Sequence, residues 1–339
     1  MPRTLVALHC ALLACCAMPP PNEPAPSPTT DPDARFLGTE PCPDPSAGLL
    51  IEESDDFRAG DDPAPLVVLM GGGVEVDDAA VRFGQAASGG DVLVLRATGS
   101  TSSYTTWFAE ELALAPAPSA VGTVLIEDPD AGDDDAVLCR VARADALWLA
   151  GGDQGDYLVR WPAALHEAMA RAVARGVAVG GTSAGAMSLS ALTFDASLGS
   201  VDSTVALGDP LAEALSLSRS PFAVHALDDW QVDTHFGERE RLGRLVAFLA
   251  RAAHDGTPVL GLGIDEETAV VIEGESVDVS GAGDAWLVAL DDAPALDRDT
   301  PLDARAHVAP LSRQAGWPPT TGAAAPDASA LVVVDGVLQ

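Results

Sequence analysis

The sequence predicts an α/β domain with a mostly parallel sheet that carries helices on both faces. Five short runs rich in Val, Leu and Ala are apolar along almost their whole length, which is typical of parallel strands buried on both faces. Helical stretches separate these runs, so that strand and helix alternate over residues 66–181. Ligands of such sheets bind beyond the carboxyl ends of the strands, so we expect the chemistry in the loops there.

The elements follow one another in a regular order. The expected strands are Leu66–Met70, Val92–Ala97, Val121–Glu127, Ala146–Ala150 and Val177–Gly181. The expected helices are Asp77–Ser88, Tyr104–Leu114, Asp133–Arg143 and Pro162–Arg175. A later helix is expected over about 238–254, and an apolar strand follows it at 260–264. Beyond residue 291 the pattern is weak: 330–338 is expected to be a closing strand and 318–328 to be loose.

Composition excludes several classes of function. The 339 residues carry 51 acidic and 18 basic side chains, which gives a formal charge of −33. We therefore expect no nucleic-acid partner, because phosphates would be repelled. Hydrophobic residues make up 47% of the chain, enough for a sizeable core, so the acidity is not that of a disordered chain. The charge also suits attraction of a cationic substrate or adaptation to salt, and the composition leaves both open.

The first residues resemble an export signal. Arg3 precedes an apolar run over 5–14, which is too short to span a bilayer. We predict a signal peptide over 1–17. Leu12-Leu13-Ala14-Cys15 resembles a lipobox, in which Cys15 would be lipidated, and an ordinary secretory signal is the alternative. The protein is therefore expected to be exported: periplasmic, anchored to the outer membrane, or extracellular.

Residues 18–65 are rich in Pro, Asp, Ala and Ser, and we predict that they form a disordered tether. Residues 66–339 are predicted to be a single domain. One cysteine, Cys42, lies in the predicted tether and another, Cys139, in the domain. In an exported chain these two could form a disulfide or remain free thiols, and the sequence leaves both options open.

The strongest local motif follows the fifth strand. Gly181-Thr-Ser-Ala-Gly185 fits the Gly-x-Ser-x-Gly pattern, with an apolar strand before it and small residues after it that can continue as a helix. Ser183 is therefore predicted to be a nucleophile on a sharp strand-to-helix turn, rather than only a helix cap. The helix N-terminus would supply N–H donors for an oxyanion.

A serine nucleophile needs a base and an acid that orients it. Among the histidines, His225 and His235 are the candidates that lie outside the signal, the predicted charged helices and the C-terminal segment. His235 stands just before a predicted helix. Glu266 lies at the end of an apolar strand, in a turn of three carboxylates, where it could reach a histidine at the carboxyl edge of the sheet.

Four motifs together resemble the cyanophycinases and the related dipeptidase E-like serine peptidases. They are Gly151-Gly-Asp-Gln154, Gly181-Thr-Ser-Ala-Gly-Ala186, Asp233-x-His-Phe-x-x-Arg-x-Arg-x-x-Arg244 and Gly261-Leu-Gly-Ile-Asp-Glu266. They occur in the family's order between about Leu66 and Leu290. The resemblance implies a class I glutamine amidotransferase-like, flavodoxin-like three-layer sandwich. It also implies a serine peptidase that acts on β-aspartyl bonds through an acyl-enzyme, with cyanophycin as the leading substrate.

The resemblance also assigns roles to residues. Ser183 would be the nucleophile, His235 the general base and Glu266 its orienting acid. The N–H groups of Gly152 and Ala184 would bind the oxyanion. The residues that match substrate-site positions are Gln154, Asp233, Thr234, Arg239, Arg241 and Arg244. Thr234 departs from the family, which has Gln at this position, so the identity of the substrate stays open.

A structural role is the alternative for some of the arginines. Glu238 with Arg241, and Glu240 with Arg244, have the spacing of helix-surface ion pairs. Arg239 and Arg241 could not both face one pocket from a regular helix, so part of this set is expected to be structural.

Two other functions stay open. An exported α/β-hydrolase-type esterase shares the serine turn, but its acid precedes its histidine, whereas here Glu266 follows His235. A catalytically silent peptide-binding lipoprotein could share the fold. No cofactor and no metal are expected, because the chain lacks a His/Cys cluster with ligand spacing. A homodimer is a further option that the sequence does not decide.

Overall fold

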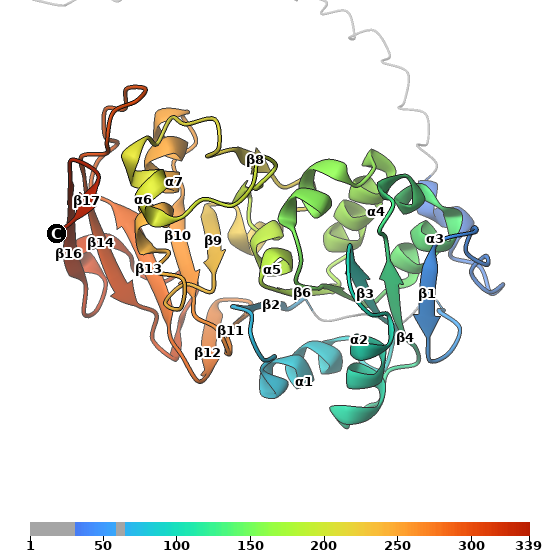
Figure 1. The fold of residues 1–339 in the computed structure, drawn as a ribbon. Coiled ribbons are helices and arrows are strands. Elements are labelled where there is room, and N and C mark those ends of the chain that lie inside the picture. Colours follow the sequence, from blue (N-terminus) through green and yellow to red (C-terminus); the bar gives the residue numbers. More distant parts are fainter. Residues whose placement is uncertain (1–30, 59–64) are drawn as a thin grey trace, which may run out of the picture. The chain divides into compact units, whose positions relative to one another are not determined.

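The computed structural model describes residues 31–58 and 65–339 (Figure 1). The predicted signal peptide, Cys15 and residues 18–30 and 59–64 of the predicted tether lie outside the described residues. Within the described part of the chain, no helix combines the length and the hydropathy that crossing a membrane requires.

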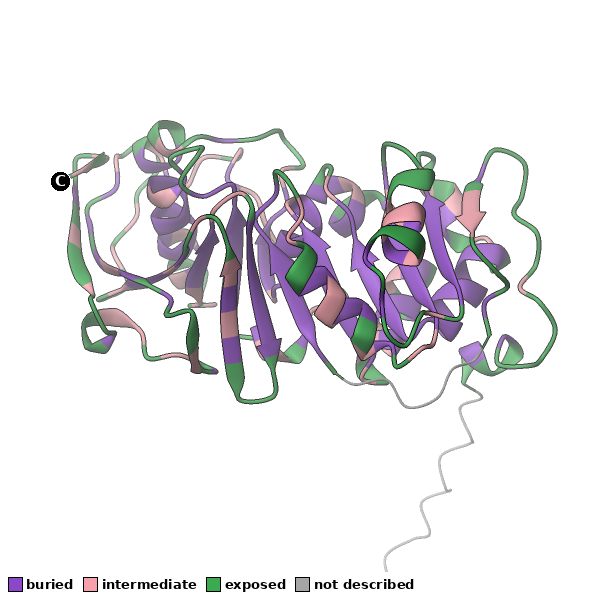
Figure 2. Ribbon diagram, turned by 90° about the horizontal axis from the view of Figure 1, so that it is seen from below, coloured by how far each residue is buried: buried purple, intermediate pink, exposed green. Residues whose placement is uncertain are grey.

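A nine-stranded sheet forms the centre of the domain, in the order β1-β4-β3-β5-β6-β2-β11-β12-β15. Its middle strands β4, β3, β5, β6 and β2 are parallel, and the strands at both sides pair antiparallel. These five strands are the predicted ones, at β2 (Val67–Met70), β3 (Val92–Arg96), β4 (Val121–Leu125), β5 (Ala146–Leu149) and β6 (Ala178–Thr182). Figure 2 shows them almost entirely buried, as their apolar sequences require.

Helices cover both faces of this sheet (Figure 1). On one face α1 (Asp77–Ala86), α2 (Ser102–Thr106) and the π-helical turn Trp107–Glu111 share a core cluster that includes Phe83, Phe108 and Trp148. On the other face lie α3 (Asp135–Arg143), α4 (Ala163–Ala174) and α5 (Ala184–Ser188). The expected mostly parallel α/β architecture is confirmed.

A second, six-stranded sheet follows in the sequence, with the order β17-β16-β14-β13-β10-β9. Only β9 and β10 are parallel in it. The helix α7 (Leu242–His254) packs on one face together with α6 (Ser203–Gly208). The strands are β9 (Trp230–Thr234), β10 (Leu260–Ile264), β13 (Ala285–Leu290), β14 (Ala304–Pro310), β16 (Ser329–Val334) and β17 (Val337–Leu338). The expected closing strand at 330–338 is thus a hairpin, and the weakly patterned region after 291 completes this sheet.

The remaining strands are short. β11 (Thr268–Glu273), β12 (Ser276–Gly281) and β15 (Gln314–Gly316) extend the nine-stranded sheet beyond β2. β7 (Leu192–Phe194) and β8 (Leu217–Arg219) form a separate two-stranded antiparallel sheet. Ala196, Gly199 and Ser200, in the loop between β7 and α6, line the pocket described below.

The prediction of a disordered tether is wrong for residues 31–58. β1 (Leu50–Glu53) pairs antiparallel with β4, and the side chains of Phe36, Leu49 and Phe57 are buried. Arg143 holds this segment by donating to the carbonyls of Phe36 and Phe57, each at 2.6 Å. The segment is poor in apolar residues, but main-chain carbonyls and a few large side chains fix it to α3.

A disulfide joins Cys42 to Cys139 and closes the alternative of two free thiols. The cysteines are 97 positions apart, so the bond closes a long loop in the unfolded chain. In the chain-entropy account, a loop of this length stabilises the fold by about 4–5 kcal/mol.

Replacing both cysteines with serine is expected to lower the free energy of unfolding by up to about 4–5 kcal/mol, because the unfolded chain regains the freedom of that loop. Urea unfolding of both proteins measures the difference. Reducing the wild type should give the same loss. An unchanged unfolding midpoint in both cases would contradict the prediction.

Candidate active site

Ser183 occupies a strained turn between β6 and α5, with φ 53° and ψ −121°. The flanking glycines make the turn sterically feasible. A Cβ on Gly185 would lie 2.1 Å from the Leu149 carbonyl oxygen, and one on Gly181 would lie 2.8 Å from the Gly185 carbonyl carbon. The Gly-x-Ser-x-Gly spacing is therefore a packing requirement, and it presents the serine side chain at the end of the parallel strands.

Ser183, His235 and Glu266 form one chain of hydrogen bonds. Ser183 Oγ lies 2.6 Å from His235 Nε2, and His235 Nδ1 lies 2.5 Å from Glu266 Oε1. With an ionised Glu266, Nδ1 carries the imidazole proton and Nε2 is free to accept the serine proton. Ser183 follows β6 of the nine-stranded sheet, whereas His235 and Glu266 follow the neighbouring strands β9 and β10 of the six-stranded sheet.

The environment of His235 favours its neutral form. Burial lowers the pKa of His235 below its ordinary value of 6.5 because the charged imidazolium loses hydration. The neighbouring Glu266 raises this pKa, while Arg239 and Arg241 lower it. The net shift is downward, so the imidazole is available as a base near neutral pH.

The glycines after β2 receive the imidazole, which the sequence did not indicate. The sequence Gly71-Gly72-Gly73 directly after β2 has neither the Gly-x-Gly-x-x-Gly spacing nor the lysine of a phosphate-binding loop, and by itself it predicts only a tight turn. In the structure the backbone N–H of His235 donates to the Gly71 carbonyl at 2.8 Å, and a Cβ on Gly72 would lie 2.3 Å from Cε1 of the His235 ring. Gly72 also has φ +98°, a conformation that side chains disfavour. A histidine ring pressed against this main chain leaves room only for glycine.

Gly72→Ala is expected to lower catalytic turnover by about a hundredfold, because the new methyl group would displace the imidazole by an ångström or more. Gly176→Ala is the matched control, since Gly176 has a similar φ of +84° but no atom within 4 Å of its Cβ position. Both variants carry the same backbone strain, so a comparison of their turnover and thermal unfolding separates strain from displacement. Equal losses of turnover in the two variants would contradict this role of Gly72.

Two further carboxylates support the turn that carries Glu266. Glu238 Oε2 accepts the Glu266 N–H at 3.0 Å. Asp265 accepts the N–H groups of Gly237 at 2.8 Å and of Asp284 at 3.1 Å. Of the three acids in the turn, Glu266 alone hydrogen-bonds to the histidine within the described chain, and Asp265 ties the loops together.

A pocket of about 200 Å³ opens at Ser183 and His235. The glycine-turn residues Gly152 and Ala184, which were predicted oxyanion donors, line it beside the serine. Gln154 also lines it, and its side-chain amide donates to the Phe194 carbonyl at 3.1 Å. The rest of the lining is Asp153, Met187, Ala196, Gly199, Ser200, Arg239, Arg241 and Arg244.

Arg239 and Arg241 both reach this pocket because the chain before α7 is not a helix. The helix begins at Leu242 rather than near 238, and residues 237–241 form turns. The expectation that a regular helix would separate the two side chains is therefore wrong. Arg239 is exposed, whereas the side chain of Arg241 is 10% exposed.

The inner arginines are held by a buried carboxylate rather than by glutamates of the same helix. Arg244 makes a bidentate pair with Asp233, at 2.5 and 2.7 Å, and Arg241 lies 3.4 Å from the same carboxylate. The alternative pairing with Glu238 and Glu240 is not formed. The single carboxylate of Asp233 thus pairs with the guanidinium groups of both Arg241 and Arg244. This leaves an excess of positive charge at the wall of the pocket.

Two of the predicted substrate-binding residues do not line the pocket. The side chains of Asp233 and Thr234 are buried, Asp233 in the ion pairs with the arginines. The hydroxyl of Thr234 has no hydrogen-bond partner among the described residues. Asp233 therefore acts on the pocket through Arg241 and Arg244.

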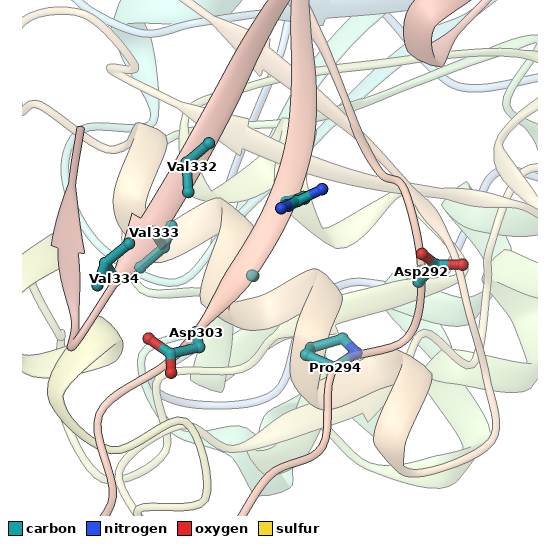
Figure 3. A pocket seen from close by; sticks show the side chains of 8 residues that line it. Asp292, Pro294, Asp303, Val332, Val333 and Val334 are labelled. Carbon is teal, nitrogen blue, oxygen red and sulfur yellow. The ribbon is translucent and has the colours of Figure 1, made fainter.

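A pocket of about 390 Å³ lies against β14 and β16, and none of the predicted site residues lines it (Figure 3). Across residues 31–58 and 65–339, no group of three or more His, Cys, Asp or Glu side chains is arranged to hold a metal ion.

Comparisons with known proteins relate part of the chain to a peptidase family. Residues 120–280 match the model described as Peptidase family S51, and this range contains Ser183, His235 and Glu266. The cyanophycinases of Synechococcus elongatus and of Thermosynechococcus vestitus are each 33% identical over 175 residues. That is 50% of this chain and 49% of each relative, so the chain spans about half the length of these curated relatives.

A solved peptidase from an acI-B1 Actinobacterium has 18% identity and a TM-score of 0.49, over 66% of this chain and 90% of that one. The range that matches the family model includes all four motifs. Residues 120–280 of this chain therefore match peptidase family S51, and the similarity to the two cyanophycinases supports the resemblance to the cyanophycinase and dipeptidase E-like family.

Proposed function

We propose that this protein is a serine-type peptidase that hydrolyses β-aspartyl peptide bonds of the cyanophycin type through an acyl-enzyme. The observation that supports it most is the hydrogen-bonded chain from Ser183 through His235 to Glu266 at the edge of one pocket. The relatives at 33% identity carry the name cyanophycinase, which supports the substrate class.

The proposed mechanism uses this geometry directly. His235 Nε2 takes the proton of Ser183 as Oγ attacks the scissile carbonyl, and Glu266 stabilises the imidazolium that forms. The N–H groups of Gly152 and Ala184 receive the developing oxyanion. His235 then returns its proton to the leaving amine, and water releases the acyl group by the reverse steps.

The pocket's charge supports an acidic group next to the scissile bond. Arg239 is exposed at the pocket, and Asp233 balances only part of the charge of Arg241 and Arg244. A free carboxylate of a β-aspartyl unit is a planar acceptor that guanidinium groups bind in bidentate fashion. The aspartyl side of the substrate would therefore lie toward these arginines.

A peptide panel tests the proposal. Purified protein lacking residues 1–30 is incubated with cyanophycin, with β-Asp-Arg and with α-Asp-Arg, and the products are identified by mass. We expect release of Asp and Arg from β-Asp-Arg, release of Arg from cyanophycin, and at least about tenfold slower cleavage of the α-linked dipeptide. Hydrolysis of simple esters together with no hydrolysis of any peptide in the panel would favour the esterase. If neither esters nor peptides are hydrolysed and a fluorophosphonate does not label Ser183, the result would favour the catalytically silent binding protein.

The pH dependence of kcat/KM follows from the environment of His235. The base acts when neutral, and burial lowers its pKa, so we expect kcat/KM to fall only below an apparent pKa that lies under 6.5. Arg239→Gln removes a positive charge, raises the pKa of His235 and moves this acidic limb to higher pH. Arg298→Gln, an exposed arginine in another loop, should leave the limb in place; an identical limb in the Arg239 variant would contradict the assignment.

Export is part of the proposal. The predicted signal and lipidation site at Cys15 lie outside the described residues, but the Cys42–Cys139 disulfide supports an oxidising compartment, where such bonds persist. Cell fractionation with a Cys15→Ser variant tests the anchor: the lipoprotein form predicts loss of membrane association, and secretion without an anchor predicts no change.

A further inference from the structure

The loop between β7 and α6 forms part of the wall of the catalytic pocket. We name residues 196–201 the wall loop. Three of them line the pocket that opens at Ser183, namely Ala196, Gly199 and Ser200. Residues 197–200 are exposed, so burial of their own side chains does not fix them. The position of this wall therefore depends on the contacts at the two ends of the loop.

A charged residue anchors the wall loop at each end. At the far end, the Val201 carbonyl accepts a hydrogen bond from Arg244 Nη1 at 3.1 Å. At the near end, Asp195 directly precedes the loop, and its carboxylate accepts three hydrogen bonds. The donors are the Ser197 N–H at 2.8 Å, the Ser216 hydroxyl at 2.5 Å and the Ser218 hydroxyl. The aspartate thus ties the start of the wall loop to β8 and to the residue before it.

Asp195 is a buried anion that does not itself line the pocket. The residue is 3% exposed and is absent from the pocket's lining. Burial raises the pKa of Asp195, but the hydrogen bonds from the three serines lower it, and the net shift is downward. Hydrogen bonds to an ionised carboxylate are stronger than those between neutral groups. Asp195 therefore acts on the pocket through the wall loop.

The chain before the wall loop is fixed independently of the Asp195 side chain. β7 pairs with β8, and the backbone N–H of Asp195 donates to the Ser216 carbonyl at 3.1 Å. The Phe194 ring stacks on the Phe248 ring, with centroids 4.7 Å apart at 15°. The bond from Gln154 to the Phe194 carbonyl belongs to this fixed part. Loss of the carboxylate would therefore loosen the wall loop and leave the catalytic serine and its neighbours in place.

We infer that Asp195 is a positioning residue, which holds the wall loop in the arrangement that closes the substrate pocket. The inference rests on the proposed function for its effect on catalysis. Without the carboxylate, the loop would adopt this arrangement for only part of the time, and the apparent affinity for substrate would fall by that fraction. In the substrate complex the loop is in place, so the rate of acyl transfer would be nearly unchanged.

The kinetic test measures KM and kcat for β-Asp-Arg separately. Asp195→Ala should raise KM at least about tenfold and leave kcat within about threefold, the result expected if the loop closes the pocket about one tenth of the time. Asp195→Asn should keep KM within about threefold of the wild type, because its amide oxygen still accepts hydrogen bonds and the Ser218 hydroxyl can accept one from its nitrogen. An equal rise in KM in both variants, or a fall in kcat without a change in KM, would overturn the inference.

Asp209→Ala is the matched control. Asp209 accepts the N–H of Leu211, two residues ahead, at 3.0 Å, just as Asp195 accepts that of Ser197. It lies beyond α6 and does not line the pocket. Its KM and kcat should equal those of the wild type, and a rise in KM as large as that of Asp195→Ala would overturn the specific role of Asp195.

Hydrogen exchange separates this inference from the proposed function. The Gly199 N–H donates to the Ala196 carbonyl at 2.8 Å, a bond within the wall loop that does not involve the carboxylate. NMR should show at least about tenfold faster exchange of this amide in Asp195→Ala than in the wild type, because the loop opens more often. Unchanged exchange would overturn the inference, whatever the protein hydrolyses. Faster exchange in a protein that hydrolyses none of the peptides would support the positioning of the loop and overturn the proposed function.

Discussion

Ser183→Ala is expected to lower kcat for a β-aspartyl peptide by about four to six orders of magnitude. The alanine has no atom that can form the acyl-enzyme, so the remaining rate would come from the oxyanion donors and substrate binding alone. The substrate's KM should change far less, because the serine hydroxyl is a small part of the pocket. Steady-state kinetics by mass detection of released Arg measures both quantities.

The fold of this variant should be unaffected. Alanine meets the same backbone strain at φ 53° as serine does, and the hydroxyl's protein partner is His235. Ser188→Ala is the matched control, because Ser188 lies in the same helix, hydrogen-bonds to the Ala184 carbonyl at 2.8 Å and does not line the pocket. A Ser183→Ala protein that keeps more than about one per cent of wild-type kcat would disprove the nucleophile.

Glu266→Gln is expected to lower kcat by about three to four orders of magnitude. Glutamine keeps the size of the side chain, but its amide can donate to His235 Nδ1 and so select the tautomer that cannot accept the serine proton. It also removes the negative charge that stabilises the imidazolium. The pKa of His235 should fall further, since the carboxylate raises it in the wild type.

Glu267→Gln is the control for this variant, because Glu267 is the next residue and exposed, and its own backbone N–H contacts the glycine loop. Its side chain should have little effect on rate. The shift in the pKa of His235 can be followed by NMR of labelled histidine in both variants. A Glu266→Gln enzyme with wild-type turnover would show that another group orients His235.

The two sets of basic and acidic residues have different structural origins. Arg241 and Arg244 point into the pocket because Asp233, two residues before His235, lies beneath them as a buried counter-ion. Glu266 lies against the glycine loop, where a Cβ on Gly73 would be 3.2 Å from the Glu266 Cβ. The two inner arginines are therefore positioned by a carboxylate of β9, and Glu266 by a loop that follows β2.

Much of the parallel sheet could be predicted because its strands are short, apolar and separated by helices of recognisable period. The antiparallel strands were harder. β14 mixes buried with exposed residues, β16 has one buried residue, and β1 lies in a segment rich in proline and acidic side chains. Their stability comes from pairing with strands distant in sequence, which no local pattern records.

The same contrast applies to the site. The residues Ser183, His235 and Glu266 stand in motifs that are local in the sequence, so their chemistry could be predicted one motif at a time. Gly72 could not, because its role depends on an imidazole 163 positions later in the chain, which only the folded structure places against it. Arg239 and Arg241 were expected on a helix, and the turn that precedes α7 lets both reach the pocket.

By itself the sequence determined the parallel α/β core and the types of side chain available for catalysis, because apolar period and small-residue turns are local properties. Only the tertiary structure decided which loops meet, since the distances between strand ends depend on sheet order. It attached residues 31–58 to the domain and added the second sheet that carries His235 and Glu266. It also decided the electrostatics of the site, because burial and distant partners govern the charge of each group.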